Sequence, residues 1–335
     1  MLNEFDLINR YFADRTLTRA DVVTGIGDDA AVIALPVEQK LVVAVDTLVC
    51  GVHFSNDASP YDIGYKALAV NLSDFAAMAA VPTWMTLSLT LPQCSESWLK
   101  DFSEGLLALA EEFSIELVGG DTTRGPLSVT VQLMGVQSKD EASVLRSGAR
   151  PGDLVYVTGC LGDAGLGLLV SQGILPVNKV FDSAVQRLHR PRARVEFGQA
   201  LSGLATAGID VSDGFLADLG HIIEASHVGA RLNLDVIPLS HAYHYLETAG
   251  LAHLLVKEEA ELSLAPSLKF ALSAGDDYEL CFTIPPEQQE QLDAVAASME
   301  CMITPVGTIE TGASMVGVDV LGKEIQLAKR GYQHF

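Results

Sequence analysis

Segments with strand-like and helix-like patterns alternate along the chain, and this alternation most limits its possible folds. Residues 127–133 (LSVTVQL) alternate between apolar and polar side chains, which predicts a strand with one buried face. Residues 40–48 (KLVVAVDTL) predict a second strand, whereas the runs at 62–82 and 97–113 predict helices. The first part of the chain is therefore expected to have mixed α and β structure.

A polar stretch at 138–152 separates two parts of the chain. It ends in Arg-Pro-Gly, which is typical of a turn, and a new strand is predicted directly after it at 154–158. A chain of 335 residues is too long for one ordinary core. We therefore predict two domains, residues 1–137 and 150–335. Further strands of the second domain are predicted at 230–236, 278–284 and 302–309, with a strand-to-helix junction at 209–214.

The charge balance limits the possible partners. Acidic residues outnumber basic residues by 43 to 21, which gives a formal net charge of −22. A nucleic-acid surface needs clustered Lys and Arg, so this balance argues against a nucleic-acid partner. The excess acids either form a solvated surface or bind divalent cations, and only their positions can separate these alternatives.

The cysteines and the hydropathy pattern favour a cytoplasmic protein. Five cysteines without a C-x-x-C pair argue against a disulfide framework and against a zinc cluster. No run approaches the roughly 18 apolar residues of a membrane span. The N-terminal segment MLNEFDLINRYFADR contains acids and no apolar core of signal-peptide length. We therefore expect no membrane partner.

Several aspartates stand inside or at the end of apolar elements. An isolated buried carboxylate is costly unless it takes up a proton, and pairing or metal ligation removes that cost. The pattern therefore favours a cation site over a solvated surface. The aspartates in question are Asp46, Asp74, Asp121, Asp210 and Asp213.

Each of these acids also has a structural alternative. Asp74 could be a buried acid held by a salt bridge or hydrogen bonds, although Asn71 shares its helix face and offers another oxygen. GIGDDAA at 25–31 could be a glycine turn capped by an aspartate. Ser212 or Asp213 could simply cap the helix that follows. Their joint occurrence nevertheless favours cation binding.

Two glycine-rich stretches suit phosphate. VGGDTTRGP at 118–126 combines glycine N–H groups with an acid, hydroxyls and Arg124. GCLGDAGLGL at 159–168 lies at a predicted strand-to-helix turn, which either cradles phosphate or only connects two elements. No P-loop pattern occurs, and His241 and His244 are predicted to be surface residues. Hard divalent cations such as Mg²⁺ acting on phosphates, and hence phosphoryl transfer, form the chemistry that these residues favour.

Seven stretches, taken together and in this order, resemble the thiamine-monophosphate kinase family. The resemblance covers nearly the whole chain and implies a two-domain α/β fold like that of aminoimidazole ribonucleotide synthetase. Its N-terminal α/β domain would form a β-barrel across a homodimer, and its C-terminal domain would be an α/β sandwich. The implied reaction transfers a phosphate from ATP to thiamine monophosphate, giving thiamine diphosphate. The stretches are GIGDDAAV, VAVDTLVCGVHF, YKALAVNLSDFAAMAA, VGGDTTRGPLSVT, IDVSDGFLADL, GDDYELCFT and GYQHF.

The resemblance also implies site residues by matching position. The accepting group is already an anionic oxygen, so no catalytic base is required, and several Mg²⁺ ions would offset the repulsion between two phosphates. The implied metal ligands are Asp29, Asp46, Asp74, Asp121, Asp210 and Asp213, with Asp28 as a supporting neighbour of Asp29. The implied nucleotide contacts are Gly120, Asp121, Arg146 and Ser212, and the implied substrate contacts are His53, Asp276 and Tyr332.

The chain departs from the family pattern at two positions. Many relatives have STDT where this chain has AVDT, so Ala44 supplies no hydroxyl and one metal would be held differently or by water. Many have GEDYEL, whereas the acid here is Asp276, whose shorter side chain makes the substrate contact longer or water-bridged.

Two alternatives to the kinase stay open. The first is another ATP-dependent enzyme of the same superfamily, although a selenium enzyme is disfavoured because the first cysteine is Cys50. The second is a non-catalytic protein that binds divalent cations.

Overall fold

The structure, a computed structural model, describes residues 10–16, 18–255, 264–329 and 331–332. The chain divides into an N-terminal unit, residues 1–75 with 80–141, and a C-terminal unit, residues 76–79 with 142–335. Most of the N-terminal segment MLNEFDLINRYFADR and the last three residues of GYQHF lie outside the described residues. In the described part, none of the helices combines the length and the apolar character needed to span a membrane.

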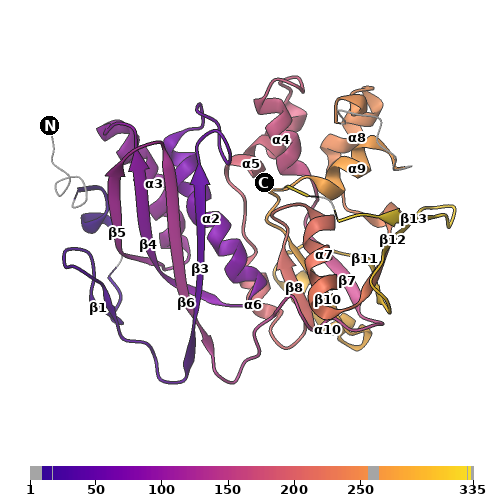
Figure 1. Cartoon of the computed structure of the whole chain (residues 1–335), viewed down its shortest axis with the longest axis horizontal. Helices are drawn as coiled ribbons and strands as arrows, with labels where there is room; N and C mark the ends of the chain where they lie inside the picture. Colours follow the sequence, from indigo (N-terminus) through magenta and orange to yellow (C-terminus); the bar gives the residue numbers. More distant parts are fainter. Residues whose placement is uncertain (1–9, 17, 256–263, 330, 333–335) are drawn as a thin grey trace. The chain divides into compact units, whose positions relative to one another are not determined.

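The N-terminal unit has an open sheet, whose described strands follow the order β3-β6-β4-β5 (Figure 1). The first three are antiparallel neighbours, and β5 runs parallel to β4 at the edge. The described residues of this chain form no closed barrel, so the dimeric barrel is not confirmed. The bounds are β3 (Gln39–Val49), β6 (Ser128–Ser138), β4 (Val81–Leu91) and β5 (Glu116–Arg124), with a separate pair β1 (Val22–Thr24) and β2 (Val32–Ile33).

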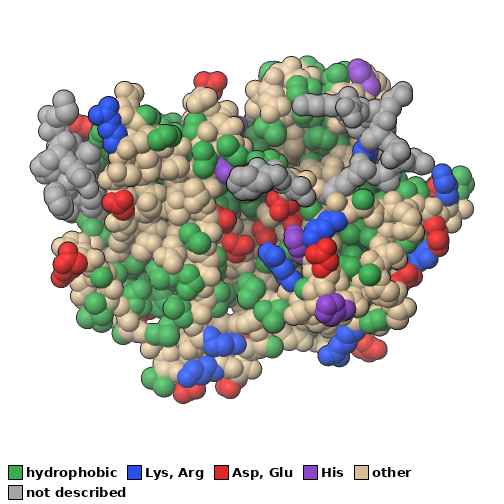
Figure 2. All heavy atoms as spheres, viewed as in Figure 1, with side chains coloured by type: hydrophobic (Ala, Val, Ile, Leu, Met, Phe, Trp, Pro, Cys, Tyr) green, Lys and Arg blue, Asp and Glu red, His purple; other side chains and the backbone are tan. Residues whose placement is uncertain are grey.

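Two helices cover one side of this sheet (Figure 1). Because side chains alternate between the faces of a strand, β3 places Leu48 in the core and its odd-numbered residues on the opposite face. There Leu41, Val43 and Val45 are 51%, 49% and 59% exposed. Figure 2 shows hydrophobic side chains gathered over this part of the N-terminal unit. The helices are α2 (Pro60–Ala77) and α3 (Glu96–Glu112).

One helix of this unit is shorter than the sequence predicts, and two glycines of the unit have a role in strand pairing. The helix predicted through residue 82 ends at Ala77, because Ala79 adopts a left-handed backbone (φ 56°) and the chain then enters β4. Gly119 and Gly120 of the stretch VGGDTTRGP lie in the edge strand β5. A side chain at Gly120 would meet the carbonyl oxygen of Leu87 at 2.0 Å, so glycine lets these strands pair closely.

The C-terminal unit has a mixed sheet, whose described strands follow the order β13-β12-β9-β11-β7-β10-β8. Neighbours are antiparallel except β12 and β9. The strands are β7 (Leu154–Thr158), β8 (Ala207–Asp210), β9 (Gly229–Asn233), β10 (Leu280–Ile284), β11 (Ile303–Glu310), β12 (Met315–Val318) and β13 (Glu324–Leu327). The helices are α4 (Asp163–Ser171), α5 (Asp182–His189), α6 (Val195–Ala200), α7 (Phe215–Ser226), α8 (His241–Thr248), α9 (Pro266–Ser273) and α10 (Gln289–Ser298).

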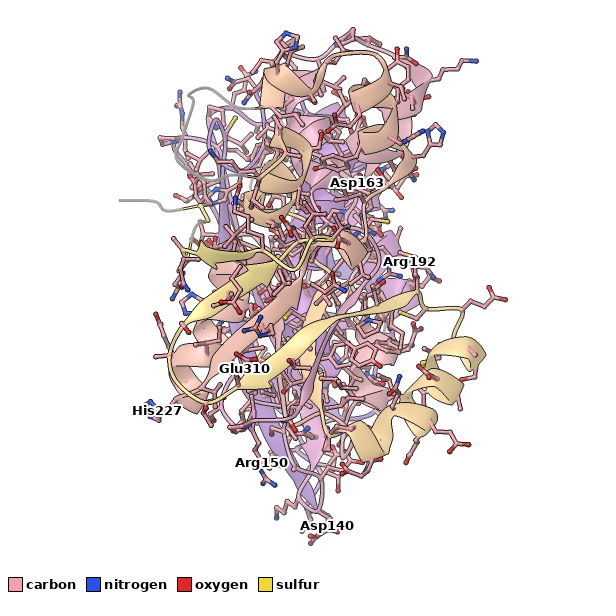
Figure 3. All side chains as sticks on the ribbon, turned by 90° about the vertical axis from the view of Figure 1, so that its right-hand side faces the viewer. Asp140, Arg150, Asp163, Arg192, His227 and Glu310 are labelled. Carbon is pink, nitrogen blue, oxygen red and sulfur yellow. The ribbon has the colours of Figure 1, made fainter. Side chains whose placement is uncertain are left out.

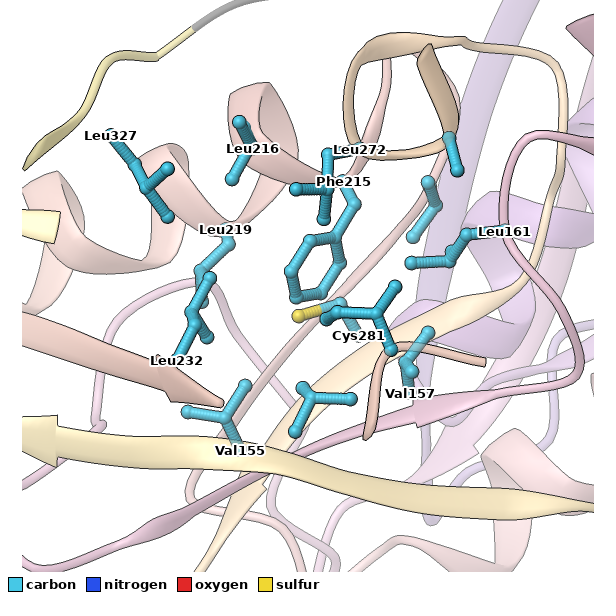
Figure 4. Packing of buried hydrophobic residues seen from close by; sticks show 14 of the residues in the cluster. Val155, Val157, Leu161, Phe215, Leu216, Leu219, Leu232, Leu272, Cys281 and Leu327 are labelled. Atoms are coloured by element: carbon cyan, nitrogen blue, oxygen red, sulfur yellow. The ribbon is translucent and has the colours of Figure 1, made fainter. Parts of the chain in front are cut away.

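Both faces of this second sheet are packed. Val155 and Val157 of β7 point into the main hydrophobic core, which includes side chains of α7 (Figure 4). Tyr156 lies between them in sequence and stacks on Phe282, with ring centroids 5.7 Å apart. Phe197 of α6 also packs against Phe282, at 6.0 Å. Since Tyr156 must point opposite to its neighbours, helices cover both faces, as the expected α/β sandwich requires.

Candidate metal and phosphate site

A pocket of about 580 Å³ opens on the N-terminal unit, lined by the turn 25–31 and by β5. Asp28, Asp29 and Asp121 line it, together with Gly120. Pockets of this size hold ligands as large as nucleotides. Three residues of the predicted set, Asp29, Gly120 and Asp121, therefore share one concave surface.

The two aspartates of the turn differ in their contacts. The N–H of Asp29 donates to Oδ1 of Asp28 at 2.8 Å, so Asp28 holds the turn in the way the capped-turn alternative describes. Both side chains are exposed at the pocket. An exposed carboxylate at a pocket wall keeps lone pairs for a cation.

Asp46 and Asp74 form a carboxyl pair between β3 and α2. The two side chains are hydrogen-bonded to each other. Burial raises the pKa of Asp46, whereas the Asp74 hydrogen bond and the nearby His53 lower it in part. Two neighbouring carboxyls share a proton readily, and a cation in the proton's place would satisfy both. Asp74 is therefore a hydrogen-bonded acid, which fits both the structural and the ligand interpretation.

His53 lies in the turn after β3, beside this pair. The N–H of Val49 donates to Nδ1 of His53 at 2.9 Å, so the proton of the neutral ring is on Nε2. The ammonium of Lys66 donates to the His53 carbonyl at 3.3 Å. The position of the imidazole is thus fixed by its own chain.

Strand pairing places Asp46 and Asp121 in different rows of the sheet. Asp46 pairs with Val131, which leads across the sheet to Leu87 and Gly120, whereas Asp121 lies in the adjacent row. Adjacent rows point to opposite faces. Among the described residues, no three His, Cys, Asp or Glu side chains form a ready-made metal centre.

In the C-terminal unit, Asp210 ends β8, and Ser212 and Asp213 lie in the turn between β8 and α7. Asp210 is only 4% exposed. Neither Ser212 nor Asp213 caps α7, whose N-cap is Gly214, so the helix-capping alternative is wrong. Instead Oδ2 of Asp218 accepts the N–H groups of Asp213 and Gly214, at 3.1 and 3.0 Å.

Asp218 is a buried acid in a negatively charged neighbourhood. It is 2% exposed. Burial raises its pKa to about 8, with Asp210 and Asp213 adding repulsion against the two backbone hydrogen bonds. The turn that carries two predicted ligands is thus built around a third carboxyl.

The loop of Asp276 runs beside the same turn. The N–H of Asp276 donates to the Ser212 carbonyl at 2.8 Å, and the Tyr278 hydroxyl donates to Oδ1 of Asp276 at 3.0 Å. The N–H of Tyr332 donates to the Asp213 carbonyl at 3.0 Å, and Tyr332 is 50% exposed. Four predicted site residues, Ser212, Asp213, Asp276 and Tyr332, therefore lie together.

Arg146 lies on a separate turn of the same unit. It is an exposed residue of the turn that precedes β7. His221 of α7 has its pKa lowered by burial and by the charges of Lys329 and Arg146, while Glu224 and Asp213 oppose this effect. Both Arg146 and Asp213 are therefore close enough to His221 to affect its charge.

Asp277 fills the glycine-rich turn internally. It is fully buried, and its carboxyl accepts the N–H groups of Gly162 and Ala164 at the start of α4, at 2.5 and 3.2 Å. Burial raises its pKa well above the usual range, although the two N–H groups oppose this. The N–H groups of the stretch 159–168 that could bind a phosphate thus already donate to the Asp277 carboxyl, so the stretch connects two elements and is not a phosphate cradle.

Glu279 forms the second internal anchor of this loop. It is fully buried and accepts hydrogen bonds from Arg187, from Arg194 at 2.7 and 2.8 Å, and from the Thr158 hydroxyl at 2.6 Å. Burial opposes its ionisation, but the two guanidinium groups prevail and lower its pKa. Arg187 also donates to the Asp277 carbonyl at 3.0 Å.

Sequence reasoning missed Asp218, Asp277 and Glu279. Glu279 had a detectable signal, an acid beside apolar residues in a predicted strand, which resembles the signal that identified Asp46. Its arginine partners lie 92 and 85 residues away in sequence, so no local pattern could reveal the pairing. His241 and His244 are exposed on α8, as predicted.

Comparisons with known proteins agree with this architecture. The family model of the AIR synthase related protein N-terminal domain matches residues 27–137, and that of the C-terminal domain matches residues 150–319. The fold and the acid-lined turns thus define an AIR synthase related protein.

Full-length relatives narrow this class. The thiamine-monophosphate kinase of Salmonella typhimurium is 45% identical over 99% of this chain and 98% of its own length. The crystal structure of the thiamine-monophosphate kinase from Stenotrophomonas maltophilia K279a is 43% identical, with a TM-score of 0.82, over 94% of this chain and 96% of that one. The structure of AaThiL complexed with AMPPCP and TMP is 29% identical, with a TM-score of 0.75, and the match covers 100% of this chain and 97% of that chain. The chain belongs to the thiamine-monophosphate kinase family.

Proposed function

We propose that this chain transfers the terminal phosphate of ATP to thiamine monophosphate and so forms thiamine diphosphate. The single observation that carries the proposal is full-length similarity to thiamine-monophosphate kinases, at 45% identity over 99% of the chain. A related structure, AaThiL, is complexed with AMPPCP and TMP. The pocket of the N-terminal unit and the gathered polar residues of the C-terminal unit supply surfaces suited to such ligands.

The proposed substrate contacts are those that the family resemblance implies, and the geometry within each unit is compatible with them. His53 would donate from Nε2 to an anionic oxygen of thiamine monophosphate. Tyr332 would stack on its rings, and Asp276, held by the Tyr278 hydroxyl, would attract its cationic ring. The proposed nucleotide contacts are Gly120, Asp121, Arg146 and Ser212.

Several Mg²⁺ ions fit the oxygen donors of the proposed site. Within the described residues, Oδ1 of Asn71 is buried without a hydrogen-bond partner, one helical turn before Asp74. With the Asp46–Asp74 pair it offers the hard oxygen ligands that Mg²⁺ prefers. Bound there, Mg²⁺ would offset the repulsion between the two reacting phosphates. The proposed ligands are Asp29, Asp46, Asp74, Asp121, Asp210 and Asp213.

A homodimer is the proposed assembly. Leu41, Val43 and Val45 expose an apolar row on the face of the N-terminal sheet opposite the helices. A second copy of this chain would cover that row and complete a barrel. The need for ATP, together with five free cysteines, supports the cytoplasm as its compartment.

One assay tests the proposal. Purified protein is incubated with ATP, MgCl₂ and thiamine monophosphate, and thiamine phosphates are separated by chromatography, with EDTA added to a parallel sample. We expect thiamine diphosphate only without EDTA. Absence of product from folded protein at saturating Mg²⁺ would reject the kinase. Metal binding without ATP turnover would then support the non-catalytic alternative, and ATP turnover without this product another enzyme of the superfamily.

A further inference from the structure

The turn that carries Arg146 is fastened by one side chain, Ser226. The Ser226 hydroxyl accepts the N–H groups of Gly148 and Ala149, at 3.1 and 3.2 Å, and donates to the carbonyl of Arg146 at 3.2 Å. Three backbone groups of a four-residue turn thus depend on a single oxygen that lies 80 residues away in sequence. A hydroxyl has one proton and two lone pairs, so Ser226 uses its full capacity here.

The turn has a second anchor, on β8. The N–H of Gly208 donates to the Leu145 carbonyl at 2.9 Å. Gly148 has φ +125°, and a side chain there would meet the Thr206 carbonyl oxygen at 2.3 Å. The turn therefore lies against the strand that leads to Asp210, in a conformation that favours glycine.

Helix α7 connects this turn to the proposed nucleotide and metal turn. In its first turn, the carboxyl of Asp218 accepts the N–H of Asp213, and the last residue of the helix is Ser226. Figure 3 shows His227 and Arg150, which follow Ser226 and Ala149 in sequence, at the same end of the C-terminal unit. Because a helix is a rigid spacer, its two ends fix the separation between the Asp213 turn and the Arg146 turn.

We propose that Ser226 is a positioning residue of the nucleotide site, whose hydroxyl fixes the backbone of the Arg146 turn at the C-terminal end of α7. The inference rests on the proposed function, because it takes Arg146 as a contact of the ATP phosphates. Ser226 itself touches no substrate. Its effect is to reduce the number of conformations that Arg146 must give up when the nucleotide binds.

The test compares variants that differ by the hydroxyl alone. Ser226→Thr keeps the hydroxyl, and Ser226→Val replaces it with a methyl group of similar shape. We expect Ser226→Val to weaken binding of a non-hydrolysable ATP analogue, measured by calorimetry, by about five- to tenfold. The KM for ATP should rise in parallel, whereas Ser226→Thr should stay close to wild type. The KM for thiamine monophosphate should stay within about twofold in both variants.

Two controls separate positioning from general stability. Ser298 is also the last residue of a helix in this unit, but its hydroxyl donates only to the Val295 carbonyl, at 2.8 Å, so Ser298→Ala should leave ATP binding unchanged. In an Arg146→Ala background, Ser226→Val should cause no further loss, because the residue that it positions is absent.

The outcomes are distinct from those of the function assay. Equal ATP affinity in Ser226→Val and wild type, or a further loss in the Arg146→Ala background, would overturn the inference while the kinase stands. An equal rise of both KM values with a lower melting temperature would also overturn it, since that result indicates only a structural role. A wild-type protein that forms no thiamine diphosphate would instead reject the proposed function.

Discussion

Replacing Asp218 with asparagine should stabilise the metal-free protein, and increasingly so as the pH rises. The burial and the two acidic neighbours of this carboxyl raise its pKa to about 8. Both backbone N–H groups donate to one oxygen, Oδ2, so the amide oxygen of asparagine can accept both. The substitution therefore removes a repelled charge without removing the hydrogen bonds of the turn.

The size and sign of the effect follow from proton linkage. An unfolded aspartate has a pKa near 3.9, so between pH 4 and pH 8 the folded wild-type protein binds more protons than the unfolded one. Its free energy of unfolding then falls as the pH rises through this window and levels off above it. The upper limit of this loss in the free energy of unfolding is about 6 kcal/mol, because each pKa unit corresponds to about 1.4 kcal/mol. A gain of only 2 kcal/mol in Asp218→Asn would raise the melting temperature by roughly 4–8 °C.

Thermal unfolding in EDTA between pH 5 and pH 9 measures this difference. The gain of Asp218→Asn over wild type should be small at pH 5 and grow until about pH 8. Asp21→Asn is a control of opposite sign, because Arg19 lowers the pKa of Asp21 below its usual value. The charged Asp21 carboxylate stabilises the folded protein at pH values above the pKa of an unfolded aspartate. Asp21→Asn should therefore lose stability at neutral pH. A gain at Asp218 that is constant or shrinks with pH would refute the reasoning.

Three further substitutions test the anchors and the ligands. Glu279→Gln should destabilise the protein by about 3 kcal/mol in urea unfolding, because Arg187 and Arg194 would lose their buried counter-charge; a loss below 1 kcal/mol would contradict this. Asp74→Asn should lower phosphoryl transfer by about a hundredfold with little change in melting temperature, and activity within a few-fold of wild type would make Asp74 a structural acid. Gly64→Ala should lower the melting temperature by several degrees, because the added carbon would lie 2.2 Å from a backbone oxygen of α3; an unchanged value would refute this.

Local patterns in the sequence predicted the elements that carry their own signal. The strand at 40–48 and the helix at 97–113 appear as β3 and α3, because alternation and helical composition are properties of neighbouring residues. The strand β4 was missed, since its apolar residues continue the preceding helix-like run. The left-handed Ala79 that separates the two elements has no sequence signal of its own.

The sequence predicted site residues that have an unusual local pattern. It did not predict roles that depend on partners far away in the sequence. Gly119 and Gly120 were predicted to offer N–H groups to phosphate, yet pairing with β4 makes them part of a strand. Ser212 and Asp213 stand where helix caps usually stand, but the N-cap is Gly214, and Asp218 inside the helix accepts the N–H groups of Asp213 and Gly214. Which residue takes each role depends on which groups come into contact in the fold, and the spacing of residues along the chain does not predict those contacts.

The buried and pocket-lining acids of the described residues fall into groups according to the hydrogen-bond partners of their carboxyls. The carboxyls of Asp277 and Glu279 accept N–H or guanidinium donors of their own chain. A cation at either carboxyl would have to displace those donors, which leaves buried groups unpaired. Asp29 and Asp121 face a pocket and are exposed, so a cation displaces only water. Asp210 is the intermediate case: it is buried, and its charge adds to the repulsion that raises the pKa of Asp218, so a cation bound there would relieve that repulsion.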